Sequence, residues 1–468
     1  MTPREFDPAR LERVFVLGLG LSGVAATRLL RRRDIEVVAS DRRGAESLET
    51  AELSTDPGVE LRLSDLSSEL PGDIDAVVVS PGIGLDHPLL VAAAAQGVPV
   101  VAEVELAWSY LDGTVLGITG SNGKSTTTAM TGALLAGAGF NVEVCGNIGR
   151  PLAAVVDGVP GRFFVVELSS FQLETIVHFR PQAATLLNIS PDHLDRHGDL
   201  AGYLAAKQRI FANQLPEDVA VLNADEPEVA TSRTAARRRL FSSTATSSLG
   251  AGCRCVGDLV CEVAEDGSEH PLFARADLSL PGTHNLENAM AAALLARAVG
   301  VPRDGLATAL AAFRGLPHRV ELVAEISGVR FVDDSKGTNV AATARSLEGF
   351  ADGSVHIVLG GRNKGADFRF LRDVVARKAR AAYLIGESAA DLAGALAGAA
   401  SCVHAGTLAV AVGAAAAAAR KGETVLLSPA CASFDQFRDY VDRGRQFAVL
   451  SQALAASAAG SGMKGPGH

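Results

Sequence analysis

Residues 117–126, which read Gly-Ile-Thr-Gly-Ser-Asn-Gly-Lys-Ser-Thr, have the types and the order of a loop that binds phosphate groups. A glycine-rich turn between a strand and a helix frees backbone N–H groups, and the helix N-terminus adds its positive dipole end. In such a loop Lys124 reaches the outer phosphates of a nucleotide and the Ser125 hydroxyl binds Mg²⁺. Ile118 replaces the first glycine of the full Walker A pattern, so the alternative is a glycine turn that only caps a core helix.

Acidic and imidazole side chains follow two later apolar runs. One run ends in Glu167, and residues 184–189 predict a strand that leads into residues 191–197, which include His193. Ligands of open α/β sheets lie beyond the carboxyl ends of the strands. Glu167 is therefore placed to hold a metal ion opposite Ser125, with an N-cap of the next helix as the alternative. The dense cluster around His193 predicts a metal or substrate site.

A second glycine pattern lies near the N-terminus. Residues 13–17 predict a strand, residues 18–23 form a Gly-x-Gly-x-x-Gly turn, and Asp41 ends the next predicted strand. This pattern predicts that a diphosphate group docks at the start of the helix that follows the turn. It does not identify the ligand, because a dinucleotide and a nucleotide-sugar diphosphate use the same contacts.

Further polar residues lie in the second half of the chain. Lys207 lies in residues 203–211, whose pattern predicts a helix with this lysine on its exposed surface. Later, polar clusters follow three predicted strands, at residues 333–339, 360–364 and 428–435. Helical stretches separate these strands, which is typical of a doubly wound sheet whose strand ends share one edge. The three clusters therefore predict one shared cleft.

These residues need a scaffold, and the alternation of strand and helix patterns predicts an α/β fold of three domains. We expect a Rossmann-like domain at residues 1–102, a central ATPase domain of the phosphate-loop type at 103–315, and a second Rossmann-like α/β domain at 316–468. Short alternating segments within residues 228–277 predict small antiparallel strands. The Gly/Ser/Ala-rich tail from about residue 458 is predicted to be disordered.

Composition excludes several function classes. The chain has 468 residues, of which 48% are hydrophobic and 21% charged, and its net charge is −10. The balance argues against global disorder and gives no electrostatic footprint for nucleic acid or an anionic membrane. No signal-like or membrane-spanning apolar run is found, and none of the six cysteines forms a Cys-x-x-Cys pair. We therefore expect a soluble cytoplasmic monomer with free thiols.

Five motifs, in this order and over nearly the whole chain, resemble the Mur ligase family: residues 120–125, 167–173, 315–319, 333–339 and 428–437. Within the family the resemblance is greatest to the branch that joins D-glutamate to UDP-N-acetylmuramoyl-L-alanine. It implies an ATP-dependent ligase that works through an acyl phosphate in cytoplasmic peptidoglycan precursor synthesis, with Mg²⁺ as its metal.

The resemblance also implies roles for individual residues. ATP would contact the loop and four later residues: Gly120, Ser121, Asn122, Gly123, Lys124, Ser125, Thr126, Asn288, Arg319, Asp334 and Lys336. The UDP-linked substrate would contact Leu21, Ser22, Asp41, Arg42, Gly82 and Asn147. Mg²⁺ would bind Ser125, Glu167, His193 and Lys207, the last as a carbamate formed with CO₂. The D-glutamate pocket would comprise Thr338, Lys364, Ser433, Phe434 and Tyr440. The catalytic group would be Lys124, Glu167, His193 and Lys207.

Two alternatives remain open at this point. The first is a related Mur ligase or a folylpolyglutamate-type ligase with another amino acid or acceptor. The L-alanine-adding relative is expected to carry a histidine-rich loop where this chain has residues 335–338. The second alternative is a nucleotide-binding regulatory protein that does not hydrolyse ATP. Such a protein needs no acids facing the phosphate loop, so Glu167 and residues 192–197 argue against it.

Overall fold

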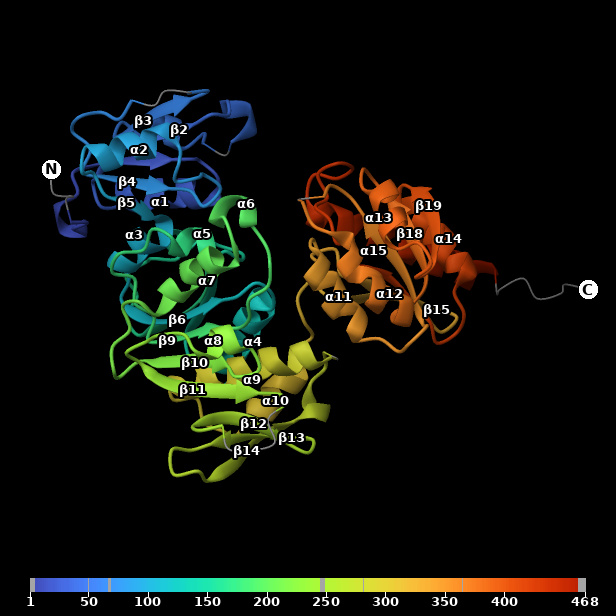
Figure 1. Ribbon diagram of the computed structural model, residues 1–468. Coiled ribbons are helices and arrows are strands. Elements are labelled where there is room, and N and C mark those ends of the chain that lie inside the picture. The colour runs from blue at the N-terminus through green and yellow to red at the C-terminus, as the bar shows by residue number, and fades with distance from the viewer. Residues whose placement is uncertain are drawn as a thin grey trace, which may run out of the picture. The chain divides into compact units, whose positions relative to one another are not determined.

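Three β-sheets carry the fold within the part of the chain that the computed structural model describes, residues 5–48, 50–65, 69–244, 249–280, 282–363 and 365–461. The chain divides into two compact units. The first unit, Met1–Leu278 with Leu286–Phe313, contains two sheets, and the second unit, Ser279–Asn285 with Arg314–His468, contains one (Figure 1). Parallel strands dominate each sheet, which confirms the predicted α/β fold class.

Five parallel strands form the N-terminal sheet of the first unit, in the order β3-β2-β1-β4-β5. Their bounds are β1 (Arg13–Leu17), β2 (Glu36–Asp41), β3 (Val59–Leu63), β4 (Ala76–Val79) and β5 (Val100–Ala102). Alternate residues face opposite sides, so Val14 packs in the core with α1 (Leu21–Arg31), whereas Phe15 packs in the core with α2 (Pro88–Ala95). Helices thus bury both faces, as a parallel sheet requires.

Nine strands form the second sheet of the first unit, in the order β14-β13-β12-β11-β10-β9-β6-β8-β7. Their bounds are β6 (Gly113–Thr119), β7 (Val142–Gly146), β8 (Arg162–Glu167), β9 (Ala183–Leu186), β10 (Val219–Asn223), β11 (Arg237–Ser242), β12 (Gly252–Val256), β13 (Leu259–Val263) and β14 (Glu269–Ala274). The last three strands pair antiparallel, as predicted. The associated helices are α4 (Lys124–Gly137), α5 (Ser170–Leu173), α6 (Leu194–His197), α7 (Leu200–Gln208), α8 (Pro227–Ala230), α9 (Thr283–Ala298) and α10 (Leu306–Ala312).

The helix α3 (Glu103–Ser109) lies between the two sheets in sequence and is fastened to the larger one by two buried carboxylates. The Glu105 carboxylate accepts the backbone N–H groups of residues 177–179 at 2.8, 2.8 and 2.9 Å. Glu103 accepts the N–H of Ala153, and burial raises the pKa of Glu103 to about 7. A loop that would otherwise lack partners for its N–H groups is thus fixed by one side chain of α3.

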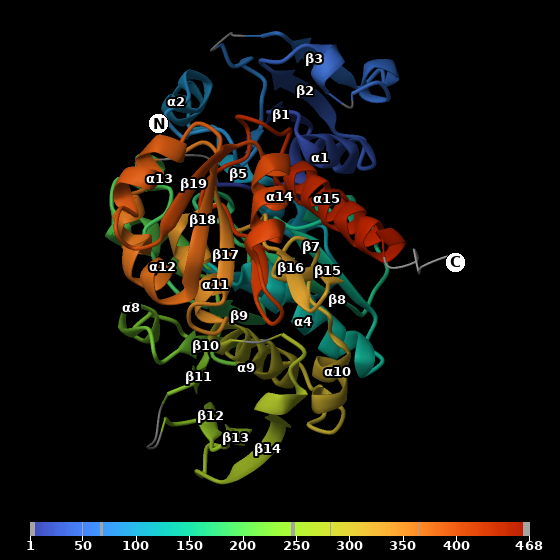
Figure 2. The ribbon, with the colours of Figure 1, turned by 90° about the vertical axis from the view of Figure 1, so that its right-hand side faces the viewer.

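Six strands form the sheet of the second unit, in the order β15-β16-β20-β17-β18-β19. Their bounds are β15 (Glu321–Ile326), β16 (Val329–Asp333), β17 (Val355–Gly360), β18 (Ala379–Ile385), β19 (Ser401–Gly406) and β20 (Thr424–Leu427). Only β15 runs antiparallel, in a hairpin with β16. One face packs on α11 (Val340–Glu348), α12 (Arg372–Lys378) and α13 (Ala389–Ala395), and the other on α14 (Leu408–Ala418) and α15 (Tyr440–Ser461) (Figure 2).

The last helix corrects one prediction. Because α15 continues to Ser461, the prediction of a disordered tail from about residue 458 is wrong for 458–461, and residues 462–468 lie outside the described residues. None of the helices in the described ranges combines the length and the apolar character needed to cross a membrane.

We predict that E105A destabilises the first unit, because three backbone N–H groups lose a buried acceptor. At about 1 kcal/mol for each group, the loss is about 3 kcal/mol, which lowers the midpoint of the first calorimetric unfolding transition by about 4–6 °C. E105Q keeps one acceptor oxygen and loses less. The control is E228A, an exposed glutamate of α8, with a shift of about 1 °C or less. Equal shifts for E105A and E228A would contradict this role of Glu105.

Candidate active site

The phosphate loop spans residues 120–123, between β6 and α4 of the first unit. Gly120 and Gly123 have φ angles of +152° and +83°, which favour glycine. A Cβ on Gly123 would lie 2.3 Å from Oδ1 of Asn288, so this amide lies close against the turn. Gly123 is the N-cap of α4 and gives the helix no side-chain acceptor. This is the arrangement of a helix N-terminus that binds anions.

The loop is tied to the segment that follows β9. Asn188 accepts the N–H of Asn122 at 2.9 Å and donates to its carbonyl at 3.1 Å. The Ser121 hydroxyl donates to the carbonyl of Ser190 at 3.1 Å and accepts the N–H of Ser190 at 2.9 Å. These bonds hold the loop in one shape before any ligand binds. Sequence reasoning did not single out Asn188 or Ser190.

Two lysines meet at the Gly120 carbonyl. Lys124 and Lys207 each donate from Nζ to this oxygen at 2.9 Å. Lys207 is 1% exposed, so the prediction of a surface lysine is wrong, because α7 packs this side chain under the loop. Burial, and after it the charge of Lys124, lowers the pKa of Lys207 well below its usual value. The ring of Tyr203, one turn earlier, covers the amine at 4.6 Å.

Glu167 ends β8 beside the loop and is 2% exposed. Its Oε1 accepts the side-chain amide of Asn147 at 2.9 Å, whereas its buried Oε2 has no hydrogen-bond partner. The N-cap alternative is wrong, because Ser169 caps α5 in a capping box with Gln172. A buried carboxylate oxygen without a donor is costly unless a cation satisfies it. The donor set therefore fits a divalent metal ion.

His193 precedes α6 in a left-handed conformation, with φ +53°. Its ring contacts Phe171 edge-on, with centroids 4.9 Å apart, and lies 6.5 Å from the ring of Tyr203, which also covers Lys207. Strand register brings the group together, because β6 pairs with β8 on one side and with β9 on the other. The phosphate loop, Glu167 and the segment that leads to His193 therefore all follow the carboxyl ends of neighbouring strands.

The glycine turn of the N-terminal sheet has the predicted geometry. Gly18 has φ +89°, and a Cβ on Gly23 would lie 1.8 Å from the Gly18 carbonyl oxygen, so the first and third glycines are both required. At the start of α1, Leu21 is 70% exposed and Ser22 is half-buried. Gly82, after β4, is exposed.

Asp41 is buried beside this turn. Its carboxylate accepts the N–H of Leu19 at 2.7 Å and the guanidinium of Arg43 at 2.8 and 3.0 Å. Burial alone would raise the pKa of Asp41, but these hydrogen bonds hold it at about 2. Sequence reasoning did not name Arg43, and Arg42, which it named as a contact of the UDP-linked substrate, is exposed.

The second unit contains its own cluster of the named residues. Asp334 is buried and accepts the hydroxyls of Ser346 and Ser428 at 2.6 Å each, and burial raises the pKa of Asp334 to about 6. Lys336 lies with Nζ 3.9 Å from the ring centre of Tyr440. The other named residues differ in exposure: Thr338 is half-buried, Ser433 is buried, and Phe434 is 64% exposed. Lys364 lies outside the described residues.

A buried arginine that sequence reasoning missed supports this cluster. Arg443 of α15 donates from Nε to the hydroxyl of Ser335 at 3.0 Å and from Nη2 to the carbonyls of Ser335 and Cys431 at 2.9 and 3.2 Å. Burial lowers the pKa of Arg443 to about 10. The guanidinium thus joins two strand-end segments that the sequence predicted to share one edge.

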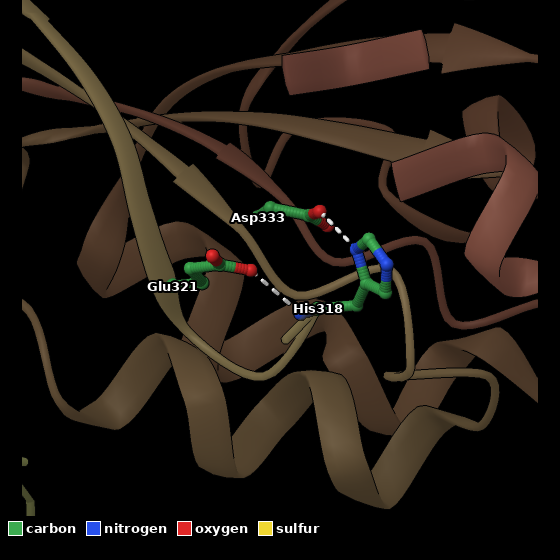
Figure 3. A group of neighbouring side chains, drawn as sticks. All are labelled: His318, Glu321 and Asp333. Carbon is green, nitrogen blue, oxygen red and sulfur yellow. Dashed lines mark hydrogen bonds and ion pairs between the residues drawn. The ribbon is translucent and has the colours of Figure 1, made fainter. Parts of the chain in front are cut away.

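Arg319 lies in a segment fixed by three neighbouring side chains (Figure 3). His318 pairs with Asp333 between Nδ1 and Oδ2 at 2.7 Å, and Glu321 accepts the His318 N–H at 2.9 Å. His318 and Val320 both have left-handed φ angles, +63° and +50°. Since the other oxygen of Asp333 accepts the N–H of Ser335 at 2.8 Å, this carboxylate links the His318 side chain, next to Arg319, to the segment that follows β16.

Three family models match most of the chain. The models match in series: Mur ligase MurD-like, N-terminal domain, at residues 12–102; Mur ligase middle domain at 118–296; and Mur ligase, glutamate ligase domain, at 318–431. The solved UDP-N-acetylmuramate-alanine ligase of Thermotoga maritima has a TM-score of 0.60 at 19% identity, covering 95% of this chain and all of that one, which shows the shared fold.

Two curated relatives match at higher identity. The UDP-N-acetylmuramoylalanine–D-glutamate ligase of Acidobacterium capsulatum is 43% identical over 451 residues, or 96% of this chain and 98% of the relative. The ligase of the same name from Anaeromyxobacter dehalogenans is 44% identical over 453 residues, or 95% and 98%. The chain therefore belongs to the Mur ligase family.

Proposed function

We propose that this protein is an ATP-dependent ligase that joins D-glutamate to UDP-N-acetylmuramoyl-L-alanine in peptidoglycan precursor synthesis. The acceptor and the amino acid come from the near full-length likeness to ligases of that name. The chemistry is carried by one observation, the meeting of Lys124 and Lys207 at the Gly120 carbonyl beside the unpartnered oxygen of Glu167.

The reaction has two balanced steps. The L-alanyl carboxylate attacks the γ-phosphorus of ATP, which forms an acyl phosphate and releases ADP. The amine of D-glutamate then adds to the acyl carbon, loses a proton, and expels inorganic phosphate as the amide forms. The Lys124 ammonium and the amides of the loop neutralise charge that develops on the transferred phosphoryl group.

The first unit has a donor set for the metal. Ser125, Glu167 and His193 would hold Mg²⁺, which supplies positive charge to the phosphate oxygens during transfer. The unpartnered Oε2 of Glu167 supports this assignment.

Lys207 would act as a carbamate. A buried lysine with a depressed pKa presents a neutral amine, which is the form that attacks CO₂. The amine nitrogen would form a bond to the carbon of CO₂ and lose one proton, which turns the neutral amine into an anionic carbamate. Such an anion would remove the repulsion with Lys124 and give Mg²⁺ a further oxygen ligand.

Each substrate would bind at one of the groups of residues described above. The UDP group would bind at the glycine turn near Leu21, Ser22, Asp41, Arg42, Gly82 and Asn147. ATP would also contact Asn288, Arg319, Asp334 and Lys336. D-Glutamate would bind near Thr338, Ser433, Phe434, Tyr440 and Lys364. The domains would be residues 1–102, 103–315 and 316–468 of a cytoplasmic monomer.

A substrate panel tests the function. We predict that purified protein given Mg²⁺, ATP and UDP-N-acetylmuramoyl-L-alanine releases phosphate only when D-glutamate is added. L-Alanine, L-glutamate and meso-diaminopimelate, supplied in turn, serve as controls for other ligases. Phosphate release that is independent of D-glutamate would contradict the assignment, and release with a different amino acid would identify a different ligase.

Trapping of the carbamate tests the role of Lys207. With ¹³C-labelled bicarbonate, followed by O-alkylation and peptide mass spectrometry, we predict label on Lys207. An exposed lysine stays an ammonium in water at neutral pH, so Lys421, which is exposed, is the internal control without label. K207A is expected to lose nearly all turnover, and added bicarbonate is not expected to restore it. Full activity of K207A, or equal label on both lysines, would disprove the carbamate role.

A further inference from the structure

Arg196 connects the two sheets of the first unit near the proposed substrate. Its Nη1 donates to the carbonyls of Pro81 and Ile83 at 3.2 and 2.8 Å. Arg196 belongs to the α6 segment, in the residues matched by the middle-domain model, whereas residues 81–83 follow β4 in the residues matched by the N-terminal model. One guanidinium therefore bridges the two matched domains.

The loop that Arg196 holds packs directly on the diphosphate turn. The Ser80 hydroxyl donates to the Gly18 carbonyl at 2.8 Å. A Cβ on Gly18 would lie 2.8 Å from Cδ1 of Ile83, so the first glycine and this loop are in close contact. A ligand that orders the glycine turn therefore also orders the carbonyls that Arg196 binds.

Arg196 also contacts Glu174 and Phe171, and the Phe171 ring supports His193. The Arg196 Nε donates to the Glu174 carboxylate at 3.1 Å, and its guanidinium carbon lies 4.4 Å from the centre of the Phe171 ring. The same ring contacts the His193 ring edge-on. The backbone N–H of residue 196 donates to the carbonyl of His193 at 3.1 Å, a bond that a substitution of the side chain retains. The Arg196 guanidinium thus fixes the ring that supports His193.

We propose that Arg196 is a positioning residue that couples binding of the UDP-linked substrate to placement of His193, and so to binding of the metal–nucleotide complex at the phosphate loop. This inference rests on the proposed function. Because coupling between two sites is reciprocal, each ligand tightens the other by the same factor, which is about 5- to 150-fold for typical systems. No bond to either ligand is required of Arg196.

Calorimetric titration measures the coupling directly. The affinity for UDP-N-acetylmuramoyl-L-alanine is determined with and without Mg²⁺ and a non-hydrolysable ATP analogue, for the parent, R196M and R32M. Arg32 is the matched control, because its guanidinium bridges the same two domains by donating to the carbonyls of Ala153 and Val156 at 3.2 and 3.3 Å, away from His193. R196K is an intermediate variant, because lysine keeps a positive charge beside Glu174 but lacks the planar guanidinium group.

We predict that the metal–nucleotide complex tightens substrate binding at least about fivefold in the parent and in R32M, and less than about twofold in R196M. R196K is expected to lie between these values, and if R196M does not fold, coupling in R196K as strong as in the parent overturns the proposal. The proposal is overturned if the parent shows no coupling, if R196M keeps it, or if R32M loses as much. Failure of the proposed function looks different, because the parent then binds no UDP-linked substrate under either condition.

Discussion

The Gly120 carbonyl oxygen is the point on which the active site depends, because two lysine side chains donate to it at the same distance. Two ammonium groups so close together repel by about 3 kcal/mol at an effective dielectric constant of about 20. The repulsion falls on Lys207, since that amine is buried while Lys124 is half-buried. In the proposed function, Lys124 is therefore the cation for phosphate, and Lys207, whose pKa is lowered, supplies a neutral amine.

Strand pairing and helix α7 bring the two lysines to the Gly120 carbonyl. Because β6 pairs in parallel with β8 and β9, the loop, Glu167 and the segment of Asn188 all lie at the carboxyl ends of these strands. The loop has little freedom there, because its glycines have left-handed angles, Asn188 accepts the N–H of Asn122, and Ser190 donates its N–H to the Ser121 hydroxyl. Helix α7 then brings the Lys207 amine to the Gly120 carbonyl of the loop. The site is thus assembled by strand register and completed by one helix.

The sequence predicted those parts of the fold and site that local patterns encode. Glycines and strand ends located the phosphate loop, Glu167, His193 and the diphosphate turn. Contacts between distant segments were not readable: Glu105 holds residues more than 70 positions away, and Arg196 binds carbonyls more than 110 positions away. The pattern around Lys207 gave the wrong exposure, because a short helix does not reveal which neighbour will cover it. The ion pair between Arg43 and Asp41 was likewise not predicted from the sequence.

The central claim is that the phosphate loop of the first unit binds the triphosphate of ATP through Lys124. Titration of K124A with Mg²⁺ and ATP tests it most directly, with K421A, a change at an exposed lysine of the second unit, as the control. A lost charged hydrogen bond predicts binding weaker by about 10- to 100-fold in K124A, and unchanged binding in K421A. Equal affinity of the parent and K124A, with ATP still consumed, would contradict the account.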